Sequence, residues 1–203
     1  GLSIHIGSQI CKIAPFRKAF KKIRNLILLL RKHNIFIDSL DIGGGIGIIY
    51  EAQKDKVFKI SDYALLVENN FADLGIEIII EPGRFLVGAS GVLISKVIRI
   101  KKGKNKYFLI VDAGMNNLLR PSLYSSKHSI FPVKSGNKKV KYDIVGPICE
   151  TSDIFRKSYL LPKQDKNDLI IICSVGAYGS SMSSDYNLRG FAKEVLVDGN
   201  RVL

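Results

Sequence analysis

The sequence is poor in cysteine and histidine, and it has no long run of apolar residues. Its three cysteines, Cys11, Cys149 and Cys173, make no disulfide framework, which predicts a reducing, cytoplasmic location. The three histidines show no Cys/His spacing of a zinc site, so no metal is expected. No stretch approaches the ~20 apolar residues of a membrane-spanning helix, and the start at Gly1 lacks the basic segment of a signal peptide. We therefore expect no membrane association.

Acidic residues are scarce as well, since 18 Asp and Glu stand against 31 Lys and Arg, a formal net charge of +13. Such a charge invites a nucleic-acid partner. However, the lysines fall in loops and on one helix face, without a basic stripe interleaved with aromatic residues. We therefore interpret them as solvated surface lysines and expect no nucleic-acid binding. A composition of 46% hydrophobic and 24% charged residues excludes general disorder.

Residues 1–88 repeat one pattern, in which a buried strand ends in a polar or glycine-rich turn and helices lie between the strands. Apolar strands alternating with helices favour a parallel α/β sheet, and the polar strand ends match the active-site edge of a (β/α)8 barrel. Three strands cannot close a barrel, so residues 1–88 are predicted to be the last part of a TIM-type barrel. The expected strands are 2–6, 35–42 and 76–80, and the expected helices are 15–33 and 62–73.

Residues 89–203 have a different character, because short β-branched segments are separated by Gly, Pro, Asn and Lys with little helical periodicity. This pattern predicts a C-terminal, mostly antiparallel β domain. The fold class is therefore α/β plus all-β. The expected strands are 87–100, 107–113, 139–145, 169–174 and 194–197.

Two consecutive strand ends carry residues suited to an anion. Gly43–Gly45 does not match the dinucleotide-binding pattern, and a glycine cluster after a strand is often only a tight turn. Its position beside Gly83 and Arg84, at the next strand end, favours a shared phosphate site. Glu81 suits a protonated ring nitrogen, although an exposed ion pair with Arg84 is the simpler alternative.

Two further candidates are weaker when each is taken alone. His5, at the first strand end, is suited to stack on a planar cofactor, although a lone histidine on a strand is more often a satisfied core residue. Cys149 and Glu150 place a thiol beside a carboxylate in a turn, although a lone cysteine is most often a buried small apolar residue. Cys11 and Cys173 are interpreted as structural.

Six segments, in their order along nearly the whole chain, resemble the pyridoxal-phosphate-dependent decarboxylases that have an alanine-racemase-like barrel. Within that family, the resemblance favours members that decarboxylate meso-diaminopimelate to L-lysine. The segments are His5–Gln9, Gly43–Gly47, Glu81–Arg84, Arg120–Tyr124, Cys149–Glu150 and Gly176–Gly179.

The resemblance implies pyridoxal 5'-phosphate as cofactor. His5 would stack on the cofactor ring, Glu81 would pair with the ring nitrogen, and Tyr178 would close over the cofactor. Ser8, the glycine run and Arg84 would surround the phosphate. The implied cofactor-binding residues are His5, Ser8, Gly43, Gly44, Gly45, Glu81, Pro82, Gly83, Arg84 and Tyr178.

The resemblance also implies how the substrate is held. Cys149 would protonate the product carbon and, with His5, is a predicted catalytic residue. Arg120 suits the distal carboxylate of diaminopimelate and Glu150 its ammonium group. Cys149 and Glu150 would reach the partner's site in a homodimer. The implied substrate-binding residues are Arg84, Arg120, Tyr124, Glu150 and Tyr178.

The chain departs from the family at Asp185, where Asn is usual, and at Gly190, where Pro is usual. No lysine stands in the context of the family's Schiff-base lysine, so we expect a C-terminal fragment that is inactive alone. One alternative is a decarboxylase for another basic amino acid, of the carboxynorspermidine, ornithine or arginine type. The other is a non-catalytic, degenerate fragment or regulatory subunit, although four intact residues argue against long decay: Cys149, Glu150, Glu81 and Tyr178.

Overall fold

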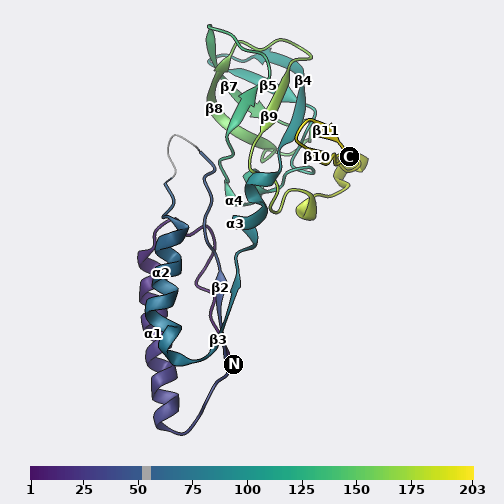
Figure 1. Ribbon diagram of the computed structural model, residues 1–203. Helices are drawn as coiled ribbons and strands as arrows, with labels where there is room; N and C mark the ends of the chain where they lie inside the picture. Colours follow the sequence, from purple (N-terminus) through teal and green to yellow (C-terminus); the bar gives the residue numbers. More distant parts are fainter. Residues whose placement is uncertain (52–55) are drawn as a thin grey trace. The chain divides into compact units, whose positions relative to one another are not determined.

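The computed structural model describes residues 1–51 and 56–203 (Figure 1). The chain divides into two compact units, Gly1–Ala89 (unit 1) and Ser90–Leu203 (unit 2). Among the described residues, no helix has the length and apolar character needed to cross a membrane.

Unit 1 is a small parallel sheet with its two long helices lying side by side on one face (Figure 1). The strand order is β1-β2-β3, and both pairs are parallel, which confirms the parallel α/β arrangement. The closed TIM-type barrel stays a prediction. The elements are β1 (Leu2–Ser3), α1 (Ala14–Lys32), β2 (Ser39–Gly44), α2 (Ile60–Phe71), η1 (Ala72–Leu74), β3 (Glu77–Glu81), α3 (Gly83–Val87) and η2 (Gly88–Ser90).

Helix α1 forms because its apolar residues recur at helical spacing. Phe16, Phe20, Ile23 and Ile27 are all buried, three or four residues apart, and they pack into one cluster with β2 and α2. Pro15 lies in the first turn, where its missing N–H removes no helical hydrogen bond. This apolar stripe holds α1 against the sheet.

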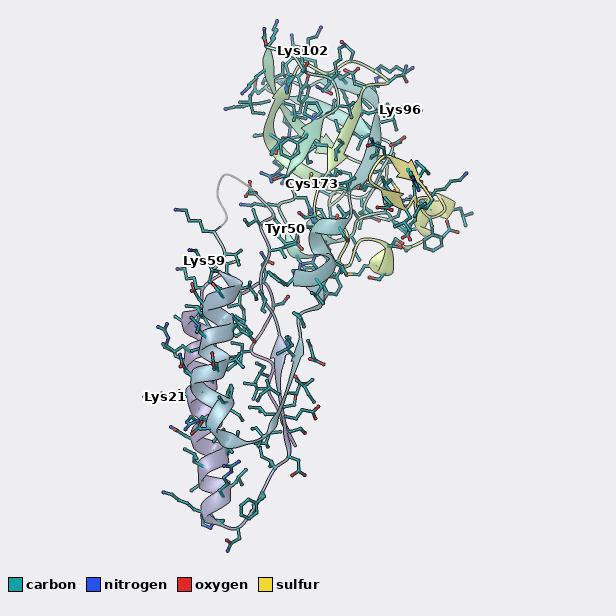
Figure 2. The ribbon with its side chains drawn as sticks, viewed as in Figure 1. Lys21, Tyr50, Lys59, Lys96, Lys102 and Cys173 are labelled. Atoms are coloured by element: carbon teal, nitrogen blue, oxygen red, sulfur yellow. The ribbon has the colours of Figure 1, made fainter. Side chains whose placement is uncertain are left out.

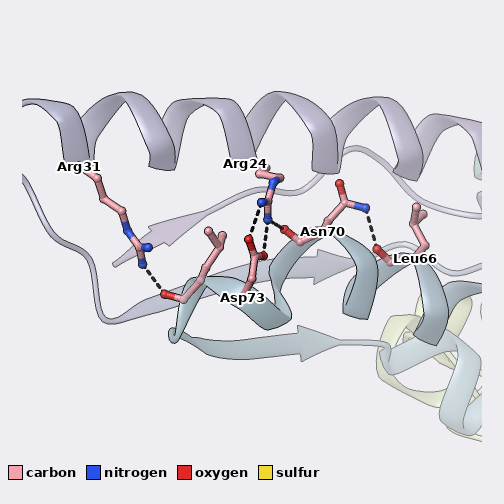
Figure 3. Close-up of polar contacts among 6 residues, drawn as sticks. Arg24, Arg31, Leu66, Asn70 and Asp73 are labelled. Carbon is pink, nitrogen blue, oxygen red and sulfur yellow. Dashed lines mark hydrogen bonds and ion pairs between the residues drawn. The ribbon is translucent and has the colours of Figure 1, made fainter.

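Arginines of α1 fasten it to the end of α2, as Figure 3 shows. The Arg24 guanidinium binds Asp73 in a two-pronged ion pair, with both N···O distances 2.6 Å, and also donates to the Asn70 carbonyl. Arg31 donates to the Leu74 carbonyl. Because carbonyls at a helix end have no partner within the helix, these donors satisfy them while joining the two helices.

Unit 2 is built on a six-stranded sheet of order β6-β9-β4-β5-β7-β8. All neighbours are antiparallel except β5 and β7, which are parallel. The end strands β6 and β8 also contact each other, so the sheet is nearly closed. The elements are β4 (Leu93–Lys102), β5 (Tyr107–Val111), α4 (Arg120–Tyr124), β6 (Ile130–Pro132), β7 (Lys139–Val145), β8 (Ile154–Pro162), β9 (Leu169–Ile172), η3 (Ser180–Met182), η4 (Tyr186–Leu188), β10 (Val197–Asp198) and β11 (Arg201–Val202).

The mostly antiparallel prediction for unit 2 is confirmed, with one difference. The chain does not return directly from β5 to β7 by a hairpin but passes through α4 and β6, and such a crossover connection allows the parallel β5–β7 pair. The expected strand 87–100 is wrong in its first residues, since α3 and η2 precede β4. The expected strand 194–197 is replaced by the short β10–β11 pair.

The surplus lysines are exposed, as the sequence predicts. Lys21 on α1, Lys59 before α2, and Lys96 and Lys102 on β4 are all exposed (Figure 2). Their exposure fits the strongly basic composition. Nothing in their placement adds to the candidate site.

Candidate functional site

In unit 1 the ends of the three parallel strands bring the predicted residues together. Gly44 pairs with Glu81 in the sheet register, and the Gly44 N–H donates to Nδ1 of His5 at 3.4 Å. The Gln9 side chain then bridges to the next loop, donating to the Ile48 carbonyl at 2.6 Å and accepting from its N–H at 3.2 Å. The residues that follow β1, β2 and β3 therefore form one cluster.

The glycine run is required by the approach of neighbouring backbone. A Cβ on Gly44 would stand 1.9 Å from the Glu81 carbonyl oxygen, closer than any real contact. Gly43 and Gly45 have φ of +69° and +84°, which glycine adopts without the strain of a side chain. Backbone packing alone thus accounts for these glycines, and their contact with a phosphate stays a prediction.

Arg84 is the charged centre of this cluster. It lies in α3, where it is only 8% exposed, and it donates to Oγ of Ser8 at 3.0 Å and to the hydroxyl of Tyr50. Its guanidinium also lies 5.7 Å from the centroid of the Tyr50 ring. A buried guanidinium beside a serine hydroxyl is a donor set suited to an oxyanion.

The two remaining unit 1 candidates, His5 and Glu81, are exposed. The Glu81 carboxylate makes no hydrogen bond or ion pair with any residue that the structure describes, so the alternative of an ion pair with Arg84 is not formed. The His5 ring is oriented by the Gly44 N–H and keeps its exposure. Both side chains are accessible to a ligand.

In unit 2 the most unusual group is Arg120, at the start of α4. It is 8% exposed, and its guanidinium lies between two rings, 5.1 Å from that of Tyr124 and 5.2 Å from that of Tyr178. Its buried Nε has no hydrogen-bond partner, and within residues 1–51 and 56–203 no carboxylate pairs with it. Aromatic faces compensate a buried cation only partly, so this site is suited to an anion.

The loop 146–153 carries Cys149 and Glu150 at its exposed tip. Its base is fixed by Asp153, 3% exposed, whose two carboxylate oxygens accept from the N–H groups of Ile148 and Met115, each at 2.7 Å. Burial raises the pKa of Asp153, although the two N–H groups favour its charged form. The loop is therefore tied to the neighbouring loop 112–117 through one buried carboxylate.

The segment 184–190 is tied to the same side of unit 2. The Ser184 N–H donates to the Asn116 carbonyl at 2.9 Å, and Arg189 donates to the Asp112 carbonyl at 2.9 Å. A cavity of about 490 Å³ lies among these loops. It is lined by Met115, Asn116, Leu119, Glu150, Ser184 and Tyr186.

The predicted site residues thus fall into two sets, each within one unit. Unit 1 holds His5, Ser8, Gly43–Gly45 and Glu81–Arg84, and unit 2 holds Arg120, Tyr124, Cys149, Glu150 and Tyr178. The sequence did not predict three further residues of these loops, Asp153, Asn116 and Tyr186. Their contacts join loops that are far apart in the sequence, so no regular residue spacing indicates them. Within the described residues, no three His, Cys, Asp or Glu side chains are grouped to hold a metal ion.

Comparison with known proteins shows which family this chain resembles. The family model described as "Pyridoxal-dependent decarboxylase, C-terminal sheet domain" matches residues 30–176. Diaminopimelate decarboxylase of Aquifex aeolicus is 44% identical over 203 residues, 100% of this chain and 48% of the relative.

Solved structures agree with this match. Diaminopimelate decarboxylase of Helicobacter pylori, complexed with L-lysine, has a TM-score of 0.91 at 43% identity, covering 98% of this chain and 50% of the other. The enzyme of M. jannaschii, in complex with L-lysine, has a TM-score of 0.94 at 35% identity, covering 98% and 47%. The chain therefore spans about half the length of the curated relatives it matches.

Proposed function

From the premise that the chain belongs to the pyridoxal-dependent decarboxylases with a C-terminal sheet domain, we propose that it serves in the decarboxylation of meso-diaminopimelate to L-lysine. Relatives at 41–44% identity carry the name diaminopimelate decarboxylase. Solved relatives hold L-lysine. The same proposal makes unit 1 the last strands of a (β/α)8 barrel.

The observation that carries the substrate assignment is Arg120. A guanidinium buried against two rings, with which no carboxylate of a described residue pairs, is suited to a carboxylate from the substrate. Glu150 is exposed at the tip of loop 146–153, where it offers a carboxylate to an ammonium group. A substrate with both groups at its far end fits diaminopimelate, whereas a diamine-forming substrate such as ornithine has no second carboxylate.

The residues of unit 1 fit pyridoxal 5'-phosphate. Arg84 and Ser8 are donors for the phosphate oxygens, Glu81 is a free acceptor for the protonated ring nitrogen, and His5 is an exposed flat ring for stacking. When bound, the cofactor supplies an electron sink for the bond that loses its carboxylate. The loops after β2 and β3 are then those that bind phosphate in barrels of this kind.

The residues of unit 2 serve the reaction in two ways. The Cys149 thiol donates a proton to the carbon that has lost its carboxylate, and Glu150 holds the distal ammonium. Tyr178 closes over the cofactor and, with Tyr124, lies against the Arg120 guanidinium. The exposed tip of loop 146–153 suits a homodimer in which Cys149 and Glu150 serve the partner's site. Free thiols on all three cysteines suit a cytoplasmic enzyme.

A chimaeric enzyme tests this proposal. Residues 1–203 replace the matching half of the Helicobacter pylori diaminopimelate decarboxylase, and this protein is called the chimaera below. We expect the chimaera to release lysine from meso-diaminopimelate and to release no putrescine from ornithine. Residues 1–203 alone are the control and should release no lysine. A chimaera that binds pyridoxal phosphate and releases no lysine contradicts the proposal.

The glycine run gives a separate prediction about stability. Gly44→Ala should lower the free energy of unfolding of the chimaera by about 1–3 kcal/mol, because its Cβ meets the Glu81 backbone. Gly83→Ala is the matched control, since a Cβ there has no atom within 4 Å and the residue lies in α3. Thermal unfolding measures both variants. Equal midpoints would show that backbone approach does not require the glycine.

A further inference from the structure

Two consecutive residues of η4 contact the two consecutive residues at the tip of loop 146–153. The Tyr186 hydroxyl donates to Oε1 of Glu150 at 2.5 Å, and Nδ2 of Asn187 donates to Sγ of Cys149 at 3.8 Å. The carboxylate in turn raises the pKa of the Tyr186 hydroxyl, chiefly through this hydrogen bond. Each proposed functional side chain of the tip therefore has its own donor.

Backbone conformation makes this double contact feasible. Asn187 has φ 59° and ψ 26°, the left-handed region that asparagine tolerates better than most residues. Asp185 closes the turn, accepting from the Gly190 N–H at 2.6 Å through its side chain and from the Leu188 N–H at 3.0 Å through its carbonyl. The two donors are thus held by a defined turn that is itself tied to loop 112–117.

All four side chains of this group are exposed in the chain. Hydrogen bonds between exposed side chains add little to stability, so the contacts are not explained by a need to hold the fold. The hydrogen bonds instead affect where the Glu150 and Cys149 side chains point, because an unrestrained Glu or Cys side chain at a loop tip samples several rotamers. A donor at each tip side chain selects among those rotamers.

We propose that Tyr186 and Asn187 are positioning residues, Tyr186 for the ammonium-binding carboxylate of Glu150 and Asn187 for the proton-donating thiol of Cys149. This inference rests on the proposed function. In the proton transfer, the Cys149 S–H bond breaks, and the carbon supplies the electron pair of the new C–H bond. The sulfur keeps the electrons of the broken bond, and the Asn187 amide stabilises that thiolate. Since all four residues belong to unit 2, they stay together whichever subunit's site they serve.

Substitutions of the two donors should change different kinetic constants of the chimaera. Tyr186→Phe removes only the hydroxyl, and we expect KM for diaminopimelate to rise about fivefold with kcat nearly unchanged, the effect of one lost hydrogen bond. Asn187→Asp keeps the size and the left-handed preference but puts a carboxylate beside the sulfur. We expect kcat to fall about tenfold with KM nearly unchanged. Leu188→Ala, at the exposed next residue, is the control for the turn.

A second readout does not need turnover. The thiolate is the reactive form of cysteine, so Asn187→Asp should slow alkylation of Cys149 by iodoacetamide about fivefold or more relative to Leu188→Ala, as peptide mass spectrometry measures. Equal alkylation rates overturn the role of Asn187, even in a chimaera without activity.

Comparison with direct variants separates the two proposals. If Glu150→Gln and Cys149→Ala impair the chimaera while Tyr186→Phe and Asn187→Asp behave like Leu188→Ala, the positioning roles are wrong and the proposed function stands. If Glu150→Gln and Cys149→Ala also leave KM and kcat unchanged, the proposed function itself fails.

Discussion

Replacing Cys149 by alanine in the chimaera is expected to lower kcat for diaminopimelate about 10²–10⁴-fold, the usual contribution of a general acid. The thiol is exposed at the loop tip, as a proton donor to a ligand requires, and Asn187 donates to its sulfur. Alanine removes that proton source and leaves the donors of unit 1 intact. The visible absorbance of bound pyridoxal phosphate should therefore stay unchanged while steady-state turnover falls.

Cys173 provides the matched control. It is half-buried directly after β9, away from the tip of loop 146–153 in the chain, and burial raises the pKa of its thiol. Cys173→Ala should change kcat little. A Cys149→Ala chimaera with the original kcat would refute the proton-donor role.

Replacing Arg120 by alanine is expected to lower kcat/KM for diaminopimelate about 10- to 100-fold, the range for a lost hydrogen bond to a charged group. The distal carboxylate would lose the one buried cation that lies between Tyr124 and Tyr178 in the described part of unit 2. The cofactor absorbance should persist, since Arg120 is proposed to bind the substrate and not the cofactor. Steady-state kinetics over a range of diaminopimelate concentrations measures the change.

Arg99, exposed on β4, is the matched control for removing an arginine, and its alanine variant should keep kcat/KM. Glu150→Gln should weaken binding in the same direction, because the ammonium loses its carboxylate. If Arg120→Ala and Glu150→Gln both retain the original kcat/KM, the assignment of diaminopimelate as substrate is wrong. A substrate whose decarboxylation forms a diamine then becomes the better assignment.

The fold of unit 1 could be predicted because its signals are local. The apolar spacing of Phe16, Phe20, Ile23 and Ile27 predicts α1 without knowledge of any partner, and the strands read as apolar runs. Strand β8 in unit 2 could not be predicted in this way. Its buried residues, such as Phe155 and Leu161, do not alternate regularly with exposed ones, since the pairing with β7 shifts register twice.

In the candidate site, too, some residues could be predicted from the sequence and others could not. His5, Glu81 and Arg84 could be predicted because parallel strands bring their carboxyl ends to one edge. The glycine run is ambiguous in sequence, because a turn, a phosphate and a close backbone approach all favour glycine. Only the structure shows the Glu81 carbonyl against Gly44. Asp153 and Tyr186 depend on pairings between loops, for which the sequence has no periodic signal.

The attachment of two loops to loop 112–117 has a consequence for protein engineering. The Met115 N–H donates to Asp153 in the loop of Cys149, and the Asn116 carbonyl accepts from the Ser184 N–H in the segment of Tyr186, so loop 112–117 joins the two. A graft that carries residues 112–117, 146–153 and 184–190 together keeps these contacts intact. Exchanging Glu150 alone for a residue without an acceptor would leave the Tyr186 hydroxyl without this hydrogen bond.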